Sequence, residues 1–384
     1  RANVYWLDTN IGVYTDEQGV FEISSKEIDR KQLTVSYVGY QTETVEINDQ
    51  SVVDFKLIET GKLDEVVVKG ERPGVIISNI STIKTEQITQ TELKKAACCD
   101  LAGCFDSQTT VQPQTTNVIT DSKELRMLGL SGVYNQILID GFPMIQGLSY
   151  TYGVSSIPGT FVDNIYISKG ANSVLQGYES ISGQINVITK EPANTDKLLL
   201  NAYMNSFQEK QLNANLAFSK GKWSNLTVLH TVQPAKKNDR DEDNFLDLPL
   251  LTRYMISNKI NYGNASEWGW SHNVGVRYLN EQRVGGQESF NPETDKGSNS
   301  VYGQTVDINQ GEFQIKSNLR FDDYHRIVFI ASVLHQNQKS YFGTVGYDAQ
   351  QTNFYANLQY ELNYAKKHNL KTGFSYRHLN LNFL

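Results

Sequence analysis

The sequence predicts a mostly β fold in three parts: a small β-sandwich, an α+β domain, and the first part of a large antiparallel transmembrane β-barrel. Three observations lead to this fold class. Short alternating runs with polar turns fill residues 1–59, and small strands separated by glycine and proline fill residues 73–192. From residue 193 to residue 384 the strands become long and alternate between apolar and polar side chains, as barrel strands do when one face meets lipid and the other a lumen.

The first part, residues 1–59, has the spacing of a small sandwich. A turn at residues 15–19 precedes a strand at 20–23, and a second alternating run covers residues 33–42. The six histidines form neither a His-x-x-Glu nor a His-Glu-x-x-His zinc pattern. No peptidase site is therefore expected here, and a spacer or docking role is the simpler interpretation.

Composition narrows the function classes. The net charge of −7 argues against nucleic acid, whose binding needs concentrated Lys and Arg. The sequence contains no apolar run of the length of a transmembrane helix. No convergent set of acid, base and nucleophile can be assembled either, so we expect no enzyme and no catalytic residue.

The alternating pattern of the third part, residues 193–384, predicts the wall of a barrel. Residues 211–218, 311–321 and 352–364 each place apolar or aromatic side chains at one parity and amide or charged side chains at the other. Short connections at 219–222, 263–267, 322–324 and 365–369 alternate with longer polar segments at 234–253, 280–310 and 338–351. Outer-membrane barrels alternate periplasmic turns with extracellular loops in this way.

We count about nine strands, too few for a barrel of about 22 strands that encloses a domain. The expectation is therefore an incomplete barrel, in a chain truncated at both ends. In agreement, residues 1–6 resemble the middle of a strand rather than a signal peptide.

Four segments between Leu125 and Lys190 follow one another in a fixed order. They read LRMLGL at 125–130, LIDGFP at 138–143, KGANSVLQG at 169–177 and GQINVITKEP at 183–192. Their order and spacing strongly resemble the plug domain of TonB-dependent outer-membrane receptors. The resemblance identifies as signature positions Arg126, Gly129, Asp140, Gly141, Pro143, Lys169, Gly170, Gly177, Gly183 and Asn186. The stretch lacks the Gly-Lys-Ser/Thr ending of a phosphate loop.

The first part carries a second resemblance. The pattern TDEQGVFEI at 15–23, followed by SYVGY at 36–40, is similar to the carboxypeptidase-regulatory-like domain found ahead of the plug in Bacteroidetes receptors, here without its first strand. Despite its name, that domain implies no peptidase activity.

The resemblance implies a TonB-binding segment in the linker, residues 60–72. An extended peptide there would add as an edge strand to TonB, with backbone hydrogen bonds supplying most of the attachment. An ordinary plug strand is the alternative interpretation. The residues concerned are Leu63, Asp64, Glu65, Val66, Val67 and Val68.

The function implied by the resemblance is TonB-dependent active import of a scarce ligand across the cell outer membrane. The partners implied are TonB with its inner-membrane energising complex, outer-membrane lipid and a small-molecule ligand. The segment beginning Lys169-Gly170-Ala171 is nearer to siderophore and metal-complex receptors, which favours a metal chelate or small cofactor as cargo. Alternatives are a glycan or peptide importer working with a surface lipoprotein, and a non-transporting adhesin or secretion component. The N-terminal domains would lie in the periplasm or inside the barrel.

Cys98, Cys99 and Cys104 form a cluster without a disulfide-framework spacing. Thiols are soft ligands for copper or zinc, but this spacing matches no closed site, and buried structural cysteine is the alternative. A helix beginning at a Thr91 cap and running to Leu101 would place one apolar face in the plug core. That face would hold Leu93, Ala97, Leu101, Cys104 and Phe105.

One long polar segment carries carboxylates at nearly alternate positions: Asp239, Asp241, Asp243 and Asp247. Such a set suits Ca²⁺, which takes six to eight oxygen ligands. The segment departs from an EF-hand, because Asn244 replaces the turn glycine and Leu250 stands at position twelve. A solvated acidic loop is the alternative, and Ca²⁺ is the one cofactor that the sequence suggests.

Overall fold

In a computed structural model, the chain divides into two compact units, Arg1–Glu71 and Arg72–Leu384. The structure describes residues 2–7, 9, 11–16, 18–24, 32–37, 40–47, 52–57, 75–78, 85–96, 99–170, 180–364 and 368–384. Within the described part of the first unit, four antiparallel strands pair in the order β2-β1-β3-β4. They are β1 (Asn3–Trp6), β2 (Gly12–Tyr14), β3 (Gln32–Ser36) and β4 (Glu43–Glu46).

The first unit has a core of its own. Val4, Trp6, Leu33 and Val35 are buried together, and the indole nitrogen of Trp6 donates a hydrogen bond to the carbonyl of Ser24 at 2.9 Å. Alternate residues of the paired strands β1 and β3 supply this core, as the alternating sequence predicts. The predicted small β domain is confirmed.

The second unit begins with the plug, whose main sheet is six-stranded with the order β10-β9-β12-β11-β6-β5. Only the β9–β12 pair is parallel. The elements are β5 (Val75–Ser78), β6 (Thr85–Ile88), α1 (Gln90–Ala96), η1 (Gly103–Phe105), β7 (Val111–Asn117), β8 (Ser122–Met127), η2 (Gly132–Tyr134), β9 (Asn135–Ile139), β10 (Phe142–Ile145), η3 (Gly147–Ser149), α2 (Tyr150–Gly153), η4 (Gly159–Phe161), β11 (Val162–Lys169), β12 (Gly183–Thr189) and η6 (Pro192–Asn194).

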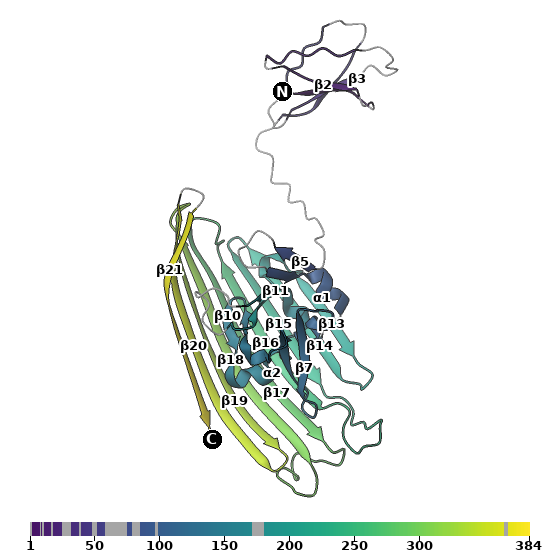
Figure 1. Cartoon of the computed structure of the whole chain (residues 1–384), viewed down its shortest axis with the longest axis vertical. Coiled ribbons are helices and arrows are strands. Elements are labelled where there is room, and N and C mark those ends of the chain that lie inside the picture. Colours follow the sequence, from purple (N-terminus) through teal and green to yellow (C-terminus); the bar gives the residue numbers. More distant parts are fainter. Residues whose placement is uncertain are drawn as a thin grey trace. The chain divides into compact units, whose positions relative to one another are not determined.

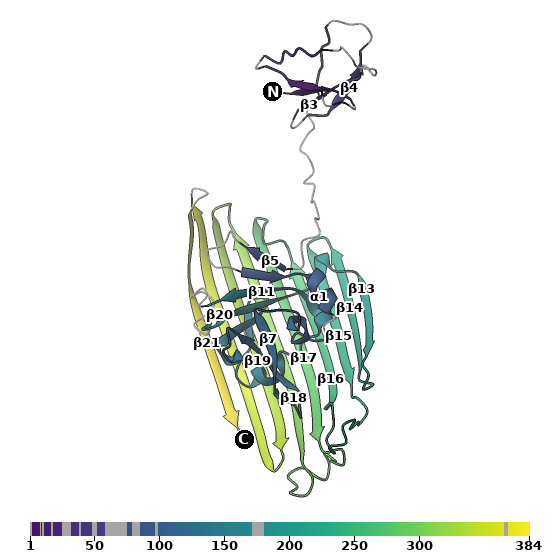
Figure 2. The same cartoon turned by 45° about the vertical axis from the view of Figure 1, so that its right-hand side comes forward.

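Nine consecutive antiparallel strands follow the plug. Figures 1 and 2 show them as a curved wall with the plug elements against its inner side. The strands are β13 (Leu198–Met204), β14 (Lys210–Lys220), β15 (Trp223–Gln233), β16 (Leu250–Tyr262), β17 (Gly269–Gly286), β18 (Gly303–Arg320), β19 (His325–Phe342), β20 (Val345–Tyr364) and β21 (His368–Phe383). The strand number that the sequence predicts is confirmed.

The wall inverts the burial pattern of a soluble protein. On β14, the polar side chains of Asn213 and Asn215 are buried, whereas Leu212 and Phe218 are exposed. The polar face meets the plug, so the exposed apolar face is the one suited to lipid. The plug core receives side chains from the wall as well, since Leu334 of β19 is buried with the plug's apolar residues.

Two predicted loops are shorter than expected. The prediction of a loop at 338–351 is wrong, because β19 and β20 pair up to Phe342 and Val345 and leave only residues 343–344 between them. The predicted loop at 280–310 contracts to 287–302. Polar side chains occur on both faces of these strand ends, and some pair across strands, such as Gln282 Nε2 donating to Asp307 Oδ1 at 2.8 Å. This composition hides the alternation that a half-apolar strand shows.

The helix expected from Thr91 to Leu101 is also shorter than predicted: α1 spans Gln90–Ala96. Asp100 lies beyond it, in a β-bridge with Pro158, and its carboxylate accepts a hydrogen bond from the backbone N–H of Gly103 at 2.9 Å. The predicted core residues Leu93, Leu101, Cys104 and Phe105 are nevertheless buried, while Ala97 lies outside the described residues. Among the helices that the structure describes, none is both long enough and apolar enough to span a membrane.

Candidate functional site: the contacts between plug and wall

The signature residues first build the plug itself. Asp140 occupies the left-handed region at φ 52°, at the turn between β9 and β10. Its carboxylate accepts hydrogen bonds from the backbone N–H of Thr189 at 2.8 Å and from the Thr189 hydroxyl at 2.6 Å. The N–H of Gly141 donates to Asn186 Oδ1 at 3.0 Å. The second and fourth sequence segments therefore meet, and the turn is tied to β12.

Other signature positions serve close packing and turns. A side chain at Gly183 would collide with Met127 and with the carbonyl oxygen of Ser168. Gly129 and Gly170 have positive φ values of 75° and 78°, which glycine adopts without strain. Pro143 lies on β10, the edge strand of the plug sheet, where the missing N–H breaks no ladder hydrogen bond. Lys169 is exposed at the end of β11, and Gly177 lies outside the described residues.

Arg126 organises a local carboxylate cluster. Its guanidinium pairs with Glu124 at 2.5 Å, and Glu124 also accepts hydrogen bonds from the hydroxyl of Ser131 and the N–H of Gly132. Burial would raise the pKa of the Glu124 carboxyl, but these three donors outweigh burial and hold that pKa below its ordinary value of 4.5.

We expect this cluster to make plug stability pH-dependent. A carboxyl with a lowered folded-state pKa adds stability that is complete above its unfolded pKa and is lost as the pH falls through the folded value. The melting temperatures of the wild type and Glu124→Gln should therefore differ at neutral pH and converge as the pH falls below about 4.5. Glu293→Gln, in the exposed 287–302 loop, is the matched control. A Glu124→Gln difference that is constant down to about pH 3 would contradict the assignment.

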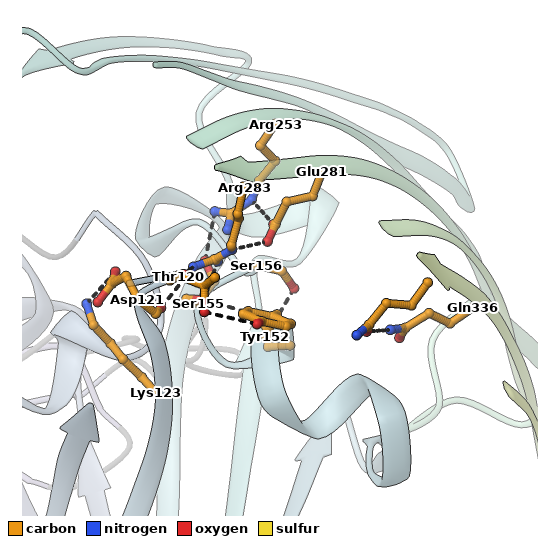
Figure 3. Close-up of polar contacts among 12 residues, drawn as sticks. Thr120, Asp121, Lys123, Tyr152, Ser155, Ser156, Arg253, Glu281, Arg283 and Gln336 are labelled. Atoms are coloured by element: carbon orange, nitrogen blue, oxygen red, sulfur yellow. Dashed lines mark hydrogen bonds and ion pairs between the residues drawn. The ribbon is translucent and has the colours of Figure 1, made fainter. Parts of the chain in front are cut away.

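The plug contacts the wall through a buried ion cluster on β16 and β17. The carboxylate of Glu281 lies 2.5 Å from Nε of Arg253 and 2.5 Å from Nε of Arg283, and all three side chains are at most 3 % exposed. Figure 3 shows both guanidinium groups reaching from the wall towards the plug. Arg253 and Glu281 are direct cross-strand partners, so the sheet register creates the pair.

Other donors of the two arginines bind plug atoms, although Arg253 Nη2 has no hydrogen-bond partner among the described residues. Arg253 Nη1 donates to the carbonyl of Ser155 at 2.8 Å. Arg283 Nη1 donates to the carbonyls of Thr120 and Asp121, both at 2.8 Å. The Arg283 guanidinium carbon also lies 4.8 Å from the ring centroid of Tyr152, a cation–π geometry. Glu281 thus holds two arginines in place for carbonyl groups of the plug.

Lys259 of β16 makes a second charged contact. Its ammonium lies 2.9 Å from Asp140 and 3.1 Å from Glu191, and it donates to the Thr189 hydroxyl at 2.6 Å. The signature residue Asp140 therefore joins the plug turn to the wall. No sequence motif marks Arg253, Lys259, Glu281 or Arg283. Their only signal is charge at the inward parity of barrel strands.

The cysteine cluster does not form a three-thiolate site. Cys104 is disulfide-bonded, so its sulfur is not available as a thiolate ligand in this state, and soft-metal binding by the cluster stays a prediction. Cys99 is half-buried, and burial raises the pKa of its thiol, which disfavours the metal-binding thiolate further. Cys98 lies outside the described residues.

In the acidic loop, one carboxylate oxygen from each of Asp239, Asp241 and Asp247 lies within 4.8 Å of the others. Asp243 is not in this group; its Oδ1 accepts a hydrogen bond from the N–H of Phe245 at 2.7 Å. The Asp243 carboxylate raises the pKa of Asp241, as like charges do. The structure thus brings together three of the four predicted ligands.

The predicted TonB-binding segment, Leu63 to Val68, lies outside the described residues. Residues 78–184 match the TonB-dependent Receptor Plug Domain family, and residues 1–68 match the CarboxypepD_reg-like domain. The chain carries a TonB-dependent receptor plug domain.

Two curated relatives of this receptor chain carry the same family name. One is a TonB-dependent receptor P39 of Formosa agariphila, 25% identical over 199 residues, which are 50% of this chain and 18% of the relative. The other is the TonB-dependent receptor SusC of Bacteroides thetaiotaomicron, 28% identical over 204 residues, 50% of this chain and 20% of the relative. The matched residues span about a fifth of each relative's length.

Solved receptors share the fold. The ferric-catecholate import receptor Fiu of E. coli K12 aligns with a TM-score of 0.59 at 14% identity, covering 79% of this chain and 50% of the other. The ferric yersiniabactin uptake receptor FyuA of Yersinia pestis gives 0.57 at 13%, covering 78% and 50%. These similar proteins are transport receptors, not enzymes, and the family consists of outer-membrane β-barrels.

Proposed function

We propose that this receptor imports a scarce ligand across the outer membrane with energy delivered through TonB. The observation that carries the proposal is the plug fastened to the inner face of a curved antiparallel wall by buried charges of β16 and β17. A domain held inside a lumen blocks passage, so transport requires its rearrangement. The sequence at 63–68, upstream of the plug, supplies a segment on which a partner can pull.

Removing a single backbone N–H from the proposed TonB-binding segment tests its role. Strand addition depends on main-chain hydrogen bonds, and proline lacks the N–H. Val66→Pro should therefore abolish capture of the full-length receptor by the periplasmic domain of TonB and abolish ligand-limited growth. Val66→Ala keeps the N–H and is the matched control. Wild-type capture and growth by Val66→Pro would refute TonB dependence through this segment.

For the cargo we propose a metal chelate or a small cofactor. The Lys169-Gly170-Ala171 sequence and the similarity to solved receptors described as ferric-catecholate and ferric yersiniabactin importers support this class. The alternative is a glycan or peptide importer that works with a surface lipoprotein, as the N-terminal β domain and the LDEVVV sequence at 63–68 suggest. Co-purification of a lipoprotein with the full-length receptor would favour that alternative.

We propose in addition that the loop of Asp239, Asp241 and Asp247 binds Ca²⁺. Three carboxylate oxygens within 4.8 Å repel one another, and a bound cation would relieve that repulsion. Calorimetry should show Ca²⁺ binding to the wild type and little or none to Asp241→Ala/Asp247→Ala. Asp295→Ala/Asp307→Ala removes two carboxylates near another loop and should leave the binding unchanged. Identical binding heats for the wild type and the Asp241→Ala/Asp247→Ala variant would contradict Ca²⁺ binding by this loop.

A further inference from the structure

The plug contacts different parts of the wall in different ways, and two of these contacts contrast in charge. On β16 and β17, the charged side chains of Arg253, Lys259 and Arg283 contact it, and Glu281 pairs with both arginines. We call these four residues the ionic anchor. On β19 and β20, the inward face beside η3 and β10 carries neutral amides, whereas the ion pair of Arg326 and Glu361 lies nearer the other end of these two strands. We call the set Gln336, Gln338, Gln351 and Asn353 the amide seam.

The ionic anchor resists separation, because pulling the plug away would leave buried charges without their partners. Arg283 loses two carbonyls and the Ser155 hydroxyl at once. Lys259 loses Asp140 and Thr189. A buried charge stripped of its partners is among the most costly states in a protein interior.

The amide seam holds the plug by neutral hydrogen bonds. Gln351 Oε1 accepts from the N–H of Leu148 at 2.5 Å, and Gln351 Nε2 donates to the carbonyl of Gln146 at 2.9 Å. Among the described residues, no ion pair joins the plug to β19, β20 or β21. Neutral hydrogen bonds exchange with water at small net cost, so the polar part of this contact is easier to open than the ionic anchor, although Leu334 of β19 adds apolar packing against the plug.

Two buried side chains show that the seam has spare hydrogen-bonding capacity. Within the described structure, neither side-chain atom of Asn353 has a partner, and Gln336 Oε1 has none. Gln336 Nε2 donates to Gln338 at 3.3 Å, a contact that Figure 3 draws on the wall beside the plug. Buried amides of this kind are satisfied by water or by a polar ligand.

We propose that the plug stays attached at the ionic anchor during transport and that the ligand passes along the amide seam, between η3 and β10 on one side and β19 and β20 on the other. The proposal rests on the import function proposed above. The seam offers hydrogen bonds and no charge, so its passage suits a polar ligand without net charge, such as a neutral metal chelate.

Two cysteine pairs test where the plug opens, in the full-length receptor with Cys99→Ser. Leu148→Cys/Gln351→Cys would lock the seam. Thr160→Cys/Asn215→Cys is the control pair and would lock the plug to β14. There the side-chain amide of Asn215 donates to the plug carbonyl of Thr160 at 3.2 Å. The two pairs are matched, because in both a wall amide binds the plug backbone. The probe is the K⁺ and Cl⁻ current through a planar lipid bilayer as urea is raised, which needs neither TonB nor ligand.

The seam disulfide should abolish the current that the wild type shows, and a reductant should restore it, whereas the control disulfide should leave the current at the wild-type level. The proposal would be overturned if the receptor with the seam disulfide carried current, or if the receptor with the control disulfide carried none. If either pair fails to cross-link, Gln351→Leu decides: it should conduct at a lower urea concentration than Gln350→Leu, the outward-facing neighbour, and equal curves would count against the seam.

The same currents test the ligand class. A neutral passage should discriminate little between K⁺ and Cl⁻, with a reversal potential near zero in a KCl gradient, and a strong preference for one ion would refute it. Because no TonB is present, these outcomes are independent of the Val66→Pro test, so failure of the seam is distinguishable from failure of the import function.

Discussion

Glu281→Ala is expected to loosen the plug by about 3–5 kcal/mol, the usual consequence of removing one partner from a buried ion cluster. Arg253 and Arg283 would face each other with no carboxylate between them. The guanidinium groups that bind Ser155, Thr120 and Asp121 would then repel one another. Protease susceptibility of the plug against urea concentration, in detergent-solubilised receptor, measures the effect.

Two controls sharpen this experiment. Glu361→Ala removes a buried wall carboxylate, but its partners Arg326 and Lys371 are 35% and 41% exposed. Water can solvate both partners after the carboxylate is lost, so its cost should be smaller than that of Glu281→Ala. The triple variant Arg253→Met/Glu281→Leu/Arg283→Met removes all three charges and should recover part of the loss, because apolar replacement of a buried ion cluster is often tolerated. Equal plug release by Glu281→Ala and Glu361→Ala would contradict the anchoring role.

Gly183→Ala is expected to cost the plug about 3 kcal/mol through overpacking. The added carbon would lie 2.5 Å from the carbonyl oxygen of Ser168 and closer still to the sulfur of Met127. Backbone cannot yield there, because β11 and β12 pair at this point, with Gly183 opposite Lys169. The thermal midpoint of plug unfolding should fall accordingly.

Gly311→Ala is the matched control, since a β-carbon at Gly311 would meet no atom within 4 Å although the residue also lies within a strand. Its effect should stay within about 0.5 kcal/mol. Similar midpoints for the two variants would show that close packing is not the reason for glycine at 183.

Sequence alone predicted the order of the three β-rich parts and the strands of the wall, because alternation is a local property of each strand. The resemblance also identified the signature residues, but not the contacts that they make in the fold. Asp140 and Thr189 are 49 residues apart, and their contact follows from a parallel β9–β12 pairing that no local pattern specifies. Likewise, Arg253 and Glu281 become partners only through the β16–β17 register.

The errors have local physical causes. The helix through Leu101 was extended because Leu93 and Leu101 share a helical spacing, whereas Asp100 bridges Pro158 and ends any helix before it. The loop at 338–351 was expected because its residues are polar at both parities. Paired strands tolerate that composition where neither face meets lipid, and Phe342 and Val345 close the hairpin tightly.

The unexpected length of the central strands sets the height of the wall. β18 and β19 have 18 residues each, or about 60 Å at about 3.4 Å per residue. Tilted by about 40°, they rise about 45 Å, whereas the apolar band of an outer-membrane barrel is about 25 Å tall. Roughly 20 Å of hydrogen-bonded wall therefore stands clear of the lipid. Under the import function proposed above, a ligand enters past this rigid part of the wall, and an epitope inserted at residues 343–344 would be displayed at its rim.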